Sequence, residues 1–288
     1  MPPLFLSAIK AGCISDIITT IKQAPARSGS VTVAGVDIGS NTAKAVLLED
    51  GDILGTSLVM TGHNSRIAGR RALDLALREA GLEESDINGM IATGYGRMSA
   101  DFTDERVTEI TCHARGAHSR QPEARTVIDL GGQDSKVIAI GETGKVIDFM
   151  MNDKCAAGTG RFLEVMAAAL EVELDNLGEI SLLSESPVSI SSVCTVFAES
   201  EVVSRVAEGA SKMDIVAGIH QAIASRIYAM TVRVPFKEKV IMTGGVARNV
   251  GVVRALEKRL ETSLVVPEMP QHMGALGAAI IAGERAGA

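Results

Sequence analysis

The chain has 288 residues, of which 46% are hydrophobic, and it carries a formal net charge of -7. This length suffices for one large domain or two ordinary ones with a buried core, and the composition argues against disorder. Aromatic residues make up only 3% of an acidic chain. We therefore expect neither base-stacking surfaces nor a basic nucleic-acid footprint, and any phosphate must be bound by local dipoles and single cations.

The N-terminal segment, residues 1–30, reads as an appendage to the rest of the chain. Its apolar start has no basic region before it, so it does not resemble a signal peptide. Residues 14–23 have the spacing of a short amphipathic helix, and 25–30 read as a linker. The apolar run 274–283 is far too short to span a bilayer. We expect a cytoplasmic protein without a membrane segment.

An internal repeat organises the next part of the chain. Residues 37–48 read DIGSNTAKAVLL and residues 129–140 read DLGGQDSKVIAI, each after an apolar, β-type run. The turn sequences EDGD at 49–52 and ETGK at 142–145 follow, which predicts two hairpins. Helical patterns come next, for example at 70–81. The repeat predicts two similar α/β domains that divide near residues 120–125. The residues that recur in register are Asp37 with Asp129, Gly39 with Gly131, and Lys44 with Lys136.

The two Asp-Gly loops have the residue types that a polyphosphate site needs. Glycine lets backbone N–H groups approach a phosphate closely, and Ser40, Thr42 and Lys44 add hydroxyl donors and a point charge. Asp37 and Asp129 are suited to holding Mg²⁺ through its waters. One copy alone is explained by a tight β-hairpin, but two copies in register favour two loops that hold a nucleotide between them. The sequence contains neither a P-loop nor a dinucleotide fingerprint.

A third segment, KVIMTGGVARN at 239–249, joins a β-type run to a helical stretch that extends to about Leu260. A Gly pair at such a junction lets an adenine or ribose lie against bare backbone. A tight strand-to-helix turn is the alternative interpretation. The position of this segment downstream of both Asp-Gly loops favours the nucleotide.

Four cysteines, Cys13, Cys112, Cys155 and Cys194, lie far apart and match neither a disulfide framework nor a zinc finger. Cys155 precedes a helical stripe at 162–170, and Cys194 also lies near a predicted helix start. A helix N-terminus lowers a thiol pKa and would suit thiolates that bind a metal cluster. On spacing alone, however, two small buried residues are the favoured interpretation. Cys112, next to His113, is expected in a packed helix rather than a zinc site.

Segments from about residue 33 to 282 closely resemble the activator ATPases of 2-hydroxyacyl-CoA dehydratases. These belong with the benzoyl-CoA reductase ATPase subunits (the BadF/BadG/BcrA/BcrD ATPases) in the acetate and sugar kinase, Hsp70 and actin superfamily. The most specific segments are FMMNDKCAAGTGRFLEVMA and SSVCTVFAESEVVS, which contain Cys155 and Cys194. The others are VDIGSNTAKAV, ATGYGR, EITCHARGA, VIDLGGQDSKVI, DIVAGIHQAIASR, VIMTGGVARN and GALGAA.

The resemblance implies an α/β fold of two ribonuclease-H-like (actin/Hsp70-type) domains with a nucleotide cleft between them. Domain I is then 31–122, completed by a C-terminal helix at 273–288, and domain II is 123–272. In this family the residues that match Cys155 and Cys194 bind one [4Fe–4S] cluster across a homodimer interface. The first loop commonly has Thr or Ser where this chain has Asn41 and Ala43; Asn41 can still donate a hydrogen bond, and Ala43 cannot.

The resemblance also assigns residues to the nucleotide and its Mg²⁺. The catalytic set is Asp37, Asp129 and Gln133. The residues expected to contact ATP or ADP are Gly39, Ser40, Asn41, Thr42, Lys44, Gly131, Gly132, Asp134, Gly158, Gly244, Gly245, Val246, Asn249 and Gln271.

The implied function is ATP-dependent, one-electron transfer. A ferredoxin or flavodoxin reduces the cluster, and the electron passes to a 2-hydroxyacyl-CoA dehydratase or a related acyl-CoA reductase component. The alternatives within the resemblance are the ATPase subunit of a benzoyl-CoA reductase and the reductase of a double-cubane cluster protein. Outside it, a small-molecule kinase of the same fold or a non-catalytic nucleotide-sensing module remains open. An exposed cluster implies an anaerobic cytoplasm.

Overall fold

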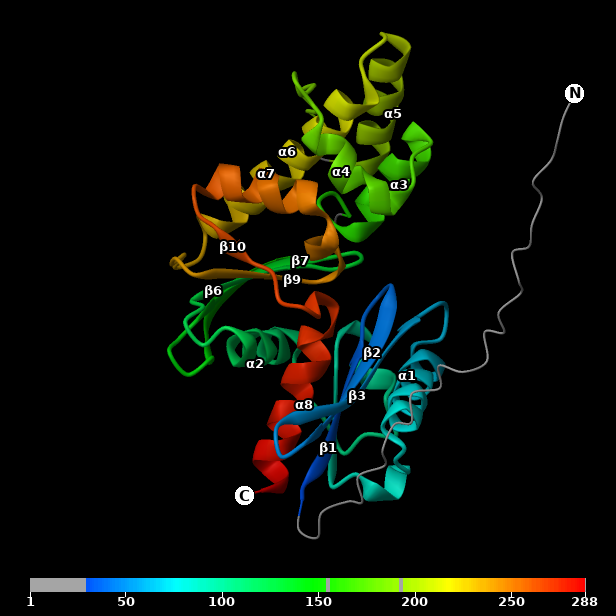
Figure 1. Cartoon of the computed structure of the whole chain (residues 1–288), viewed down its shortest axis with the longest axis vertical. Coiled ribbons are helices and arrows are strands. Elements are labelled where there is room, and N and C mark those ends of the chain that lie inside the picture. The colour runs from blue at the N-terminus through cyan, green and yellow to red at the C-terminus, as the bar shows by residue number, and fades with distance from the viewer. Residues whose placement is uncertain (1–29, 154–155, 192–193, 288) are drawn as a thin grey trace, which may run out of the picture. The chain divides into compact units, whose positions relative to one another are not determined.

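The computed structural model describes residues 30–153, 156–191 and 194–287, and it contains two mixed five-stranded sheets (Figure 1). In the first, with order β3-β2-β1-β4-β5, β1 pairs antiparallel with β2 and parallel with β4. In the second, with order β10-β9-β6-β7-β8, β6 pairs in the same way with β7 and β9. The sequence repeat is therefore a structural repeat, and the predicted α/β fold class is confirmed.

The first sheet contains β1 (Thr32–Ile38), β2 (Thr42–Glu49), β3 (Asp52–Met60), β4 (Gly89–Thr93) and β5 (Glu105–Arg106). The second contains β6 (Thr126–Leu130), β7 (Ser135–Ile140), β8 (Val146–Asn152), β9 (Val240–Thr243) and β10 (Leu264–Val265). The α-helices are α1 (Ser65–Ala80), α2 (Glu109–Arg120), α3 (Gly160–Leu170), α4 (Leu177–Leu182), α5 (Thr195–Ala207), α6 (Lys212–Thr231), α7 (Val250–Leu260) and α8 (Met273–Ala286). Two short 3₁₀ turns, Tyr95–Ser99 and Gly245–Arg248, follow β4 and β9.

Both predicted hairpins are present. β2 and β3 reverse at Asp50 and Gly51, which have φ values of 50° and 95°, as a two-residue Asp-Gly turn requires. β7 and β8 reverse around Gly144, whose φ is 72°. The helix predicted at 70–81 begins earlier, because the Asn64 side chain caps it by accepting from the Ile67 amide.

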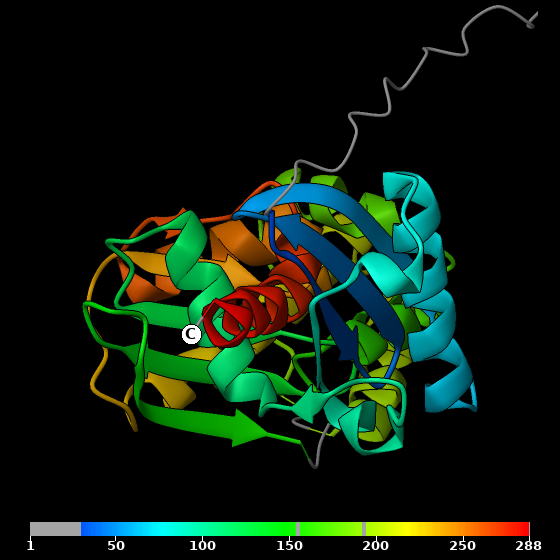
Figure 2. The same cartoon turned by 90° about the horizontal axis from the view of Figure 1, so that it is seen from below.

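Helices cover both faces of each sheet. Buried residues of α1 and α8 pack on opposite faces of the first sheet, whereas α3, α6 and α7 cover one face of the second and α2 covers the other. Figure 2, which looks along α8, shows this helix between the strands of the first sheet and α2. The two helices touch at glycines: a Cβ on Gly277 would lie 1.8 Å from the Cys112 carbonyl oxygen. This close contact joins the two halves of the structure, because α8 packs on the first sheet and α2 on the second.

The helices of the two cysteine segments form as predicted. In α3, Phe162, Met166 and Leu170 face the core. In α5 the core-facing residues are Ala198 and Val202. The apolar residues that suggested α5 lie instead on its exposed side: Val196, Phe197, Val203 and Val206. α5 therefore presents an apolar surface that the second sheet does not cover.

Some predictions fall outside the described residues. These are Cys155, Cys13 and the short helix at 14–23. Among the helices that the structure describes, none is long and apolar enough to cross a membrane.

Candidate nucleotide site

A cavity of about 430 Å³, which we call the cleft, lies where the loops of both hairpins meet the β9–α7 junction. The structure brings most of the predicted site residues to its wall. Gln133 is exposed outside this lining, and Gly158 lines a separate cavity with Arg226. The predicted residues that line the cleft are Asp37, Gly39, Ser40, Asn41, Thr42, Lys44, Asp129, Gly131, Gly132, Asp134, Gly244, Gly245, Val246, Asn249 and Gln271.

A second repeat places a bare glycine beside each loop aspartate. Gly94 follows β4 and Gly244 follows β9, both with a φ of 86° and with ψ values of 179° and 175°. A Cβ on Gly94 would lie 2.4 Å from Asp37 Oδ1, and one on Gly244 would lie 3.0 Å from Asp129 Oδ1. Sequence reasoning missed Gly94, although Thr-Gly at the end of both β-type runs was a readable signal.

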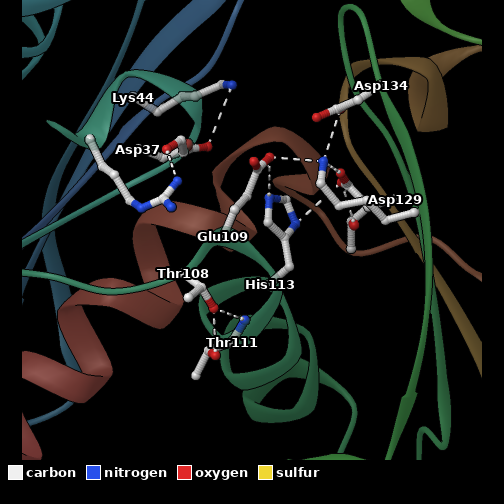
Figure 3. Close-up of polar contacts among 12 residues, drawn as sticks. Asp37, Lys44, Thr108, Glu109, Thr111, His113, Asp129 and Asp134 are labelled. Carbon is white, nitrogen blue, oxygen red and sulfur yellow. Dashed lines mark hydrogen bonds and ion pairs between the residues drawn. The ribbon is translucent and has the colours of Figure 1, made fainter. Parts of the chain in front are cut away.

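The second hairpin surrounds its lysine with carboxylates (Figure 3). The fully buried Lys136 Nζ lies 2.8 Å from Glu109 Oε1, 3.1 Å from Asp129 Oδ2 and 2.9 Å from Asp134 Oδ1. Burial alone would lower the pKa of Lys136, but these carboxylates raise it well above its usual value. Burial likewise opposes ionisation of Asp129, yet the neighbouring His113 and Lys136 hold its pKa below the usual range. Asp129 and Lys136 are therefore both ionised.

Two members of this cluster, Glu109 and His113, come from α2 and were not predicted as site residues. The Thr108 side chain caps α2 by accepting from the Thr111 amide, so Glu109 begins the helix at the cleft. His113 Nδ1 lies 3.2 Å from Asp129 Oδ1, and burial raises the pKa of Glu109 against the opposing effect of Lys136. The available signal was the i, i+4 spacing of Glu and His in EITCH, which places both on one helix face.

These α2 side chains form a candidate cation site with the second loop. One ligand atom each from Glu109, His113 and Asp129 lies within 4.8 Å of the others. Oxygen-rich groups of this kind are suited to Mg²⁺, directly or through its waters.

The first hairpin holds its lysine more openly. Lys44 Nζ donates to the Thr42 carbonyl at 3.2 Å and lies 3.6 Å from Asp37 Oδ2. Within the described residues, no donor makes a hydrogen bond to the buried Asp37 Oδ1. This loop therefore offers a free carboxylate oxygen and a cation at the cleft wall.

The two described cysteines have opposite surroundings. Cys112 is buried in the core, where burial raises the pKa of its thiol to about 12. Cys194 is exposed at the N-cap of α5, where a ligand can reach its sulfur. Of these two, only Cys194 is suited to bind a metal.

Comparison with known proteins agrees with this geometry. Residues 34–282 match the model of the BadF/BadG/BcrA/BcrD ATPase family. The chain belongs to this family. As a BadF/BadG/BcrA/BcrD-type ATPase, it contributes loops from both sheets to one cleft, and the identification from its sequence motifs is confirmed.

Named members of the family are similar over most of their length. The 2-hydroxyisocaproyl-CoA dehydratase activator of Clostridioides difficile is 47% identical over 88% of this chain and 95% of its own length. A benzoyl-CoA reductase subunit of Thauera aromatica is 35% identical over 86% and 91%. A solved structure of the Clostridium difficile activator with bound ADPNP is 46% identical over 89% and 96%, with a TM-score of 0.85.

Proposed function

We propose that this ATPase activates a 2-hydroxyacyl-CoA dehydratase by delivering a low-potential electron in an ATP-dependent step. The observation that carries the proposal is the convergence of two Asp-Gly loops on one cleft, in a chain 47% identical to a named dehydratase activator. A benzoyl-CoA reductase or a double-cubane cluster protein is the alternative partner. The dehydratase is favoured because the relative from a benzoyl-CoA reductase is only 35% identical.

The cleft residues divide into groups that fit the parts of Mg²⁺·ATP. The backbone at Gly39 and Gly131, with Lys44, is suited to the phosphates. Gly244 to Asn249 and Gln271 would accept the adenosine. The free Asp37 Oδ1 and the carboxylate of Asp129 fit a hard cation that prefers oxygen ligands. When bound, Mg²⁺ would neutralise phosphate charge.

Glu109 is our candidate for orienting the attacking water. Burial raises its pKa, and Lys136 holds its side chain at 2.8 Å at the edge of the cleft. A raised carboxyl pKa brings the group closer to the pH at which a general base works best. Gln133 is exposed on the second loop, and its role in the same step stays a prediction.

Cys155 and Cys194 of two subunits would together hold one [4Fe–4S] cluster, which supplies one-electron chemistry when bound. The exposed Cys194 fits this group, since its sulfur is accessible at the N-cap of α5 and thiolates are the usual cluster ligands. Val196 and Phe197 beside it, 67% and 69% exposed, would be covered by the second subunit of a homodimer. We therefore propose that the protein acts in an anaerobic cytoplasm.

The proposed partners follow from the electron path. A ferredoxin or flavodoxin would supply the electron, and the dehydratase would receive it for a CoA thioester that is hard to reduce. ATP drives the transfer only if it binds two arrangements of the protein with different free energies. We propose that the arrangements differ in the angle between domain I, 31–122 with 273–288, and domain II, 123–272.

The test is the iron content of anaerobically prepared cysteine variants. The wild type should contain about two irons per chain, as one cluster per dimer requires. Cys155→Ser and Cys194→Ser should each lose the iron–sulfur chromophore, whereas the matched control Cys112→Ser should keep it. Full iron in both ligand variants would refute the cluster assignment. In the same preparations, Asp129→Ala should abolish ATP hydrolysis.

A further inference from the structure

Helix α3, which follows the Cys155 segment, is bonded directly to the second phosphate loop. The Gly160 amide donates to the Gly131 carbonyl at 2.9 Å, and the Arg161 amide donates to the Gly132 carbonyl at 2.8 Å. Both loop glycines line the cleft. A displacement of this loop by a bound phosphate would therefore be transmitted to the first turn of α3.

The same helix also contacts the first loop. Asn41 Nδ2 donates to Glu164 Oε1 at 3.1 Å, across 123 residues of sequence. The two loops themselves are in contact here, because a Cβ on Gly132 would lie 2.5 Å from the Asn41 Cβ. Asn41, Gly132 and Glu164 all line the cleft. The α3 carboxylate thus lies where the two phosphate loops meet.

The charge of Glu164 makes this position unusual for a phosphate site. Its other oxygen, Oε2, pairs with Arg161 Nη1 at 2.9 Å, but the Glu164 side chain is 30% exposed and the Arg161 side chain 59%. Exposed pairs of this kind are weak, so the carboxylate keeps much of its field in the cleft. The Glu164 carboxylate would repel a terminal phosphate close to it. A phosphate oxygen that accepted a hydrogen bond from the Asn41 side-chain amide would take the place of Glu164 in that bond.

We propose that Glu164 is the residue through which the cleft distinguishes ATP from ADP and passes the difference to α3. This rests on the proposed function in one respect, that the nucleotide phosphates lie between the two loops. With ADP, Glu164 stays bonded to Asn41 and α3 stays attached to the first loop. The third phosphate of ATP displaces the carboxylate and frees α3, which leads to the cysteine segment, from that loop.

The first experiment measures the affinities of Mg²⁺·ADP and of a non-hydrolysable Mg²⁺·ATP analogue for the anaerobically purified full chain by calorimetry. Glu164→Gln keeps the shape and removes the charge, so it should tighten the ATP analogue about tenfold relative to ADP. Glu208→Gln is the matched control: Glu208 forms an i, i+3 pair of the same length, 2.9 Å, with Arg205 on α5. It should leave the ratio unchanged.

Arg161→Gln should act in the opposite direction. Loss of the neighbouring guanidinium leaves Glu164 less neutralised, so the ATP analogue should bind several-fold more weakly relative to ADP. In a Glu164→Gln background the same substitution should have no selective effect. A selective effect that persists there would mean that Arg161 contacts the phosphate itself, and would overturn the proposal.

Hydrogen exchange then tests the link to α3. In the wild type, the amides of residues 161–170 should exchange faster with the ATP analogue than with ADP, and Glu164→Gln should remove that difference. Equal effects of Glu164→Gln on ADP and ATP affinity, or weaker binding of the ATP analogue, would overturn the inference. If the wild type bound neither nucleotide, the proposed function itself would fail.

Discussion

The two hairpins use the same residues for different purposes. Their strands place Asp37 opposite Lys44 and Asp129 opposite Lys136 in equivalent register. In the first hairpin the lysine is 12% exposed, lies 3.6 Å from its aspartate and lines the cleft. In the second it is fully buried among three carboxylates and is not part of the cleft lining. A repeat in sequence therefore does not guarantee a repeat in role.

The difference comes from α2 rather than from the hairpins. α2 packs on the second sheet and directs Glu109 and His113 at Asp129 and Lys136. On the corresponding face of the first sheet, α8 brings Gly274 against Asp37, and a Cβ there would lie 2.8 Å from Asp37 Oδ2. The helix residue opposite each aspartate thus decides whether the neighbouring lysine is fixed in the structure or available to a ligand.

The largest expected effect is on folding. Lys136→Met would leave buried carboxylates without their cation and should reduce the free energy of unfolding by about 3–5 kcal/mol. Lys44→Met, at the equivalent register position, should cost less, because Lys44 lies 3.6 Å from a single carboxylate and lines the cleft. Denaturant unfolding of both variants measures the two values. Equal losses would show that the hairpins are energetically equivalent.

A pair of glycine substitutions should test whether the backbone turns after β4 and β9 are equivalent. Gly94 and Gly244 share a backbone conformation that a side chain rarely adopts, and a Cβ on either would clash with a backbone carbonyl oxygen. Gly94→Ala and Gly244→Ala should each cost at least about 2 kcal/mol, with values close to each other. Gly62→Ala, at a positive φ but in open space, is the control for conformation alone. A large loss in only one variant would break the structural equivalence.

The smallest effect is a pH dependence confined to the carboxylates around Lys136. Because the pKa of Lys136 is raised, its stabilisation is fully present below its unfolded value of about 10.5 and is lost only at higher pH. In Lys136→Met, the pKa of Glu109 in the folded protein should rise further. Ionisation of Glu109 then lowers the free energy of unfolding at pH values above the pKa that Glu109 has in the unfolded chain, and this loss disappears as the pH falls. The deficit relative to wild type should shrink by about 1–2 kcal/mol from pH 8 to pH 5. A deficit independent of pH would contradict the carboxylate cluster.

The sequence predicted what local patterns determine. The hairpin turns, the Asp-Gly loops and the end of α7 at Leu260 follow from spacing, glycine and alternation. Glu109 and His113 could not be placed in this way, because their position depends on how α2 packs against a sheet and against α8. The burial of Lys136 could not be predicted either, because its equivalence to Lys44 in the sequence repeat carries no information on burial. Nor could the sequence show which side of α5 is exposed.

The division of roles between the two lysines is tested most directly by denaturant unfolding with and without saturating Mg²⁺·ADP. Lys44→Met should lose less stability than Lys136→Met but should lose at least about 1.4 kcal/mol of the stabilisation that ADP provides, which corresponds to tenfold weaker binding. Lys136→Met should be much less stable and yet keep most of that stabilisation. If ADP stabilised Lys44→Met as much as the wild type, or if Lys136→Met lost the larger share, the assignment of Lys44 to the phosphates and Lys136 to the fold would be wrong.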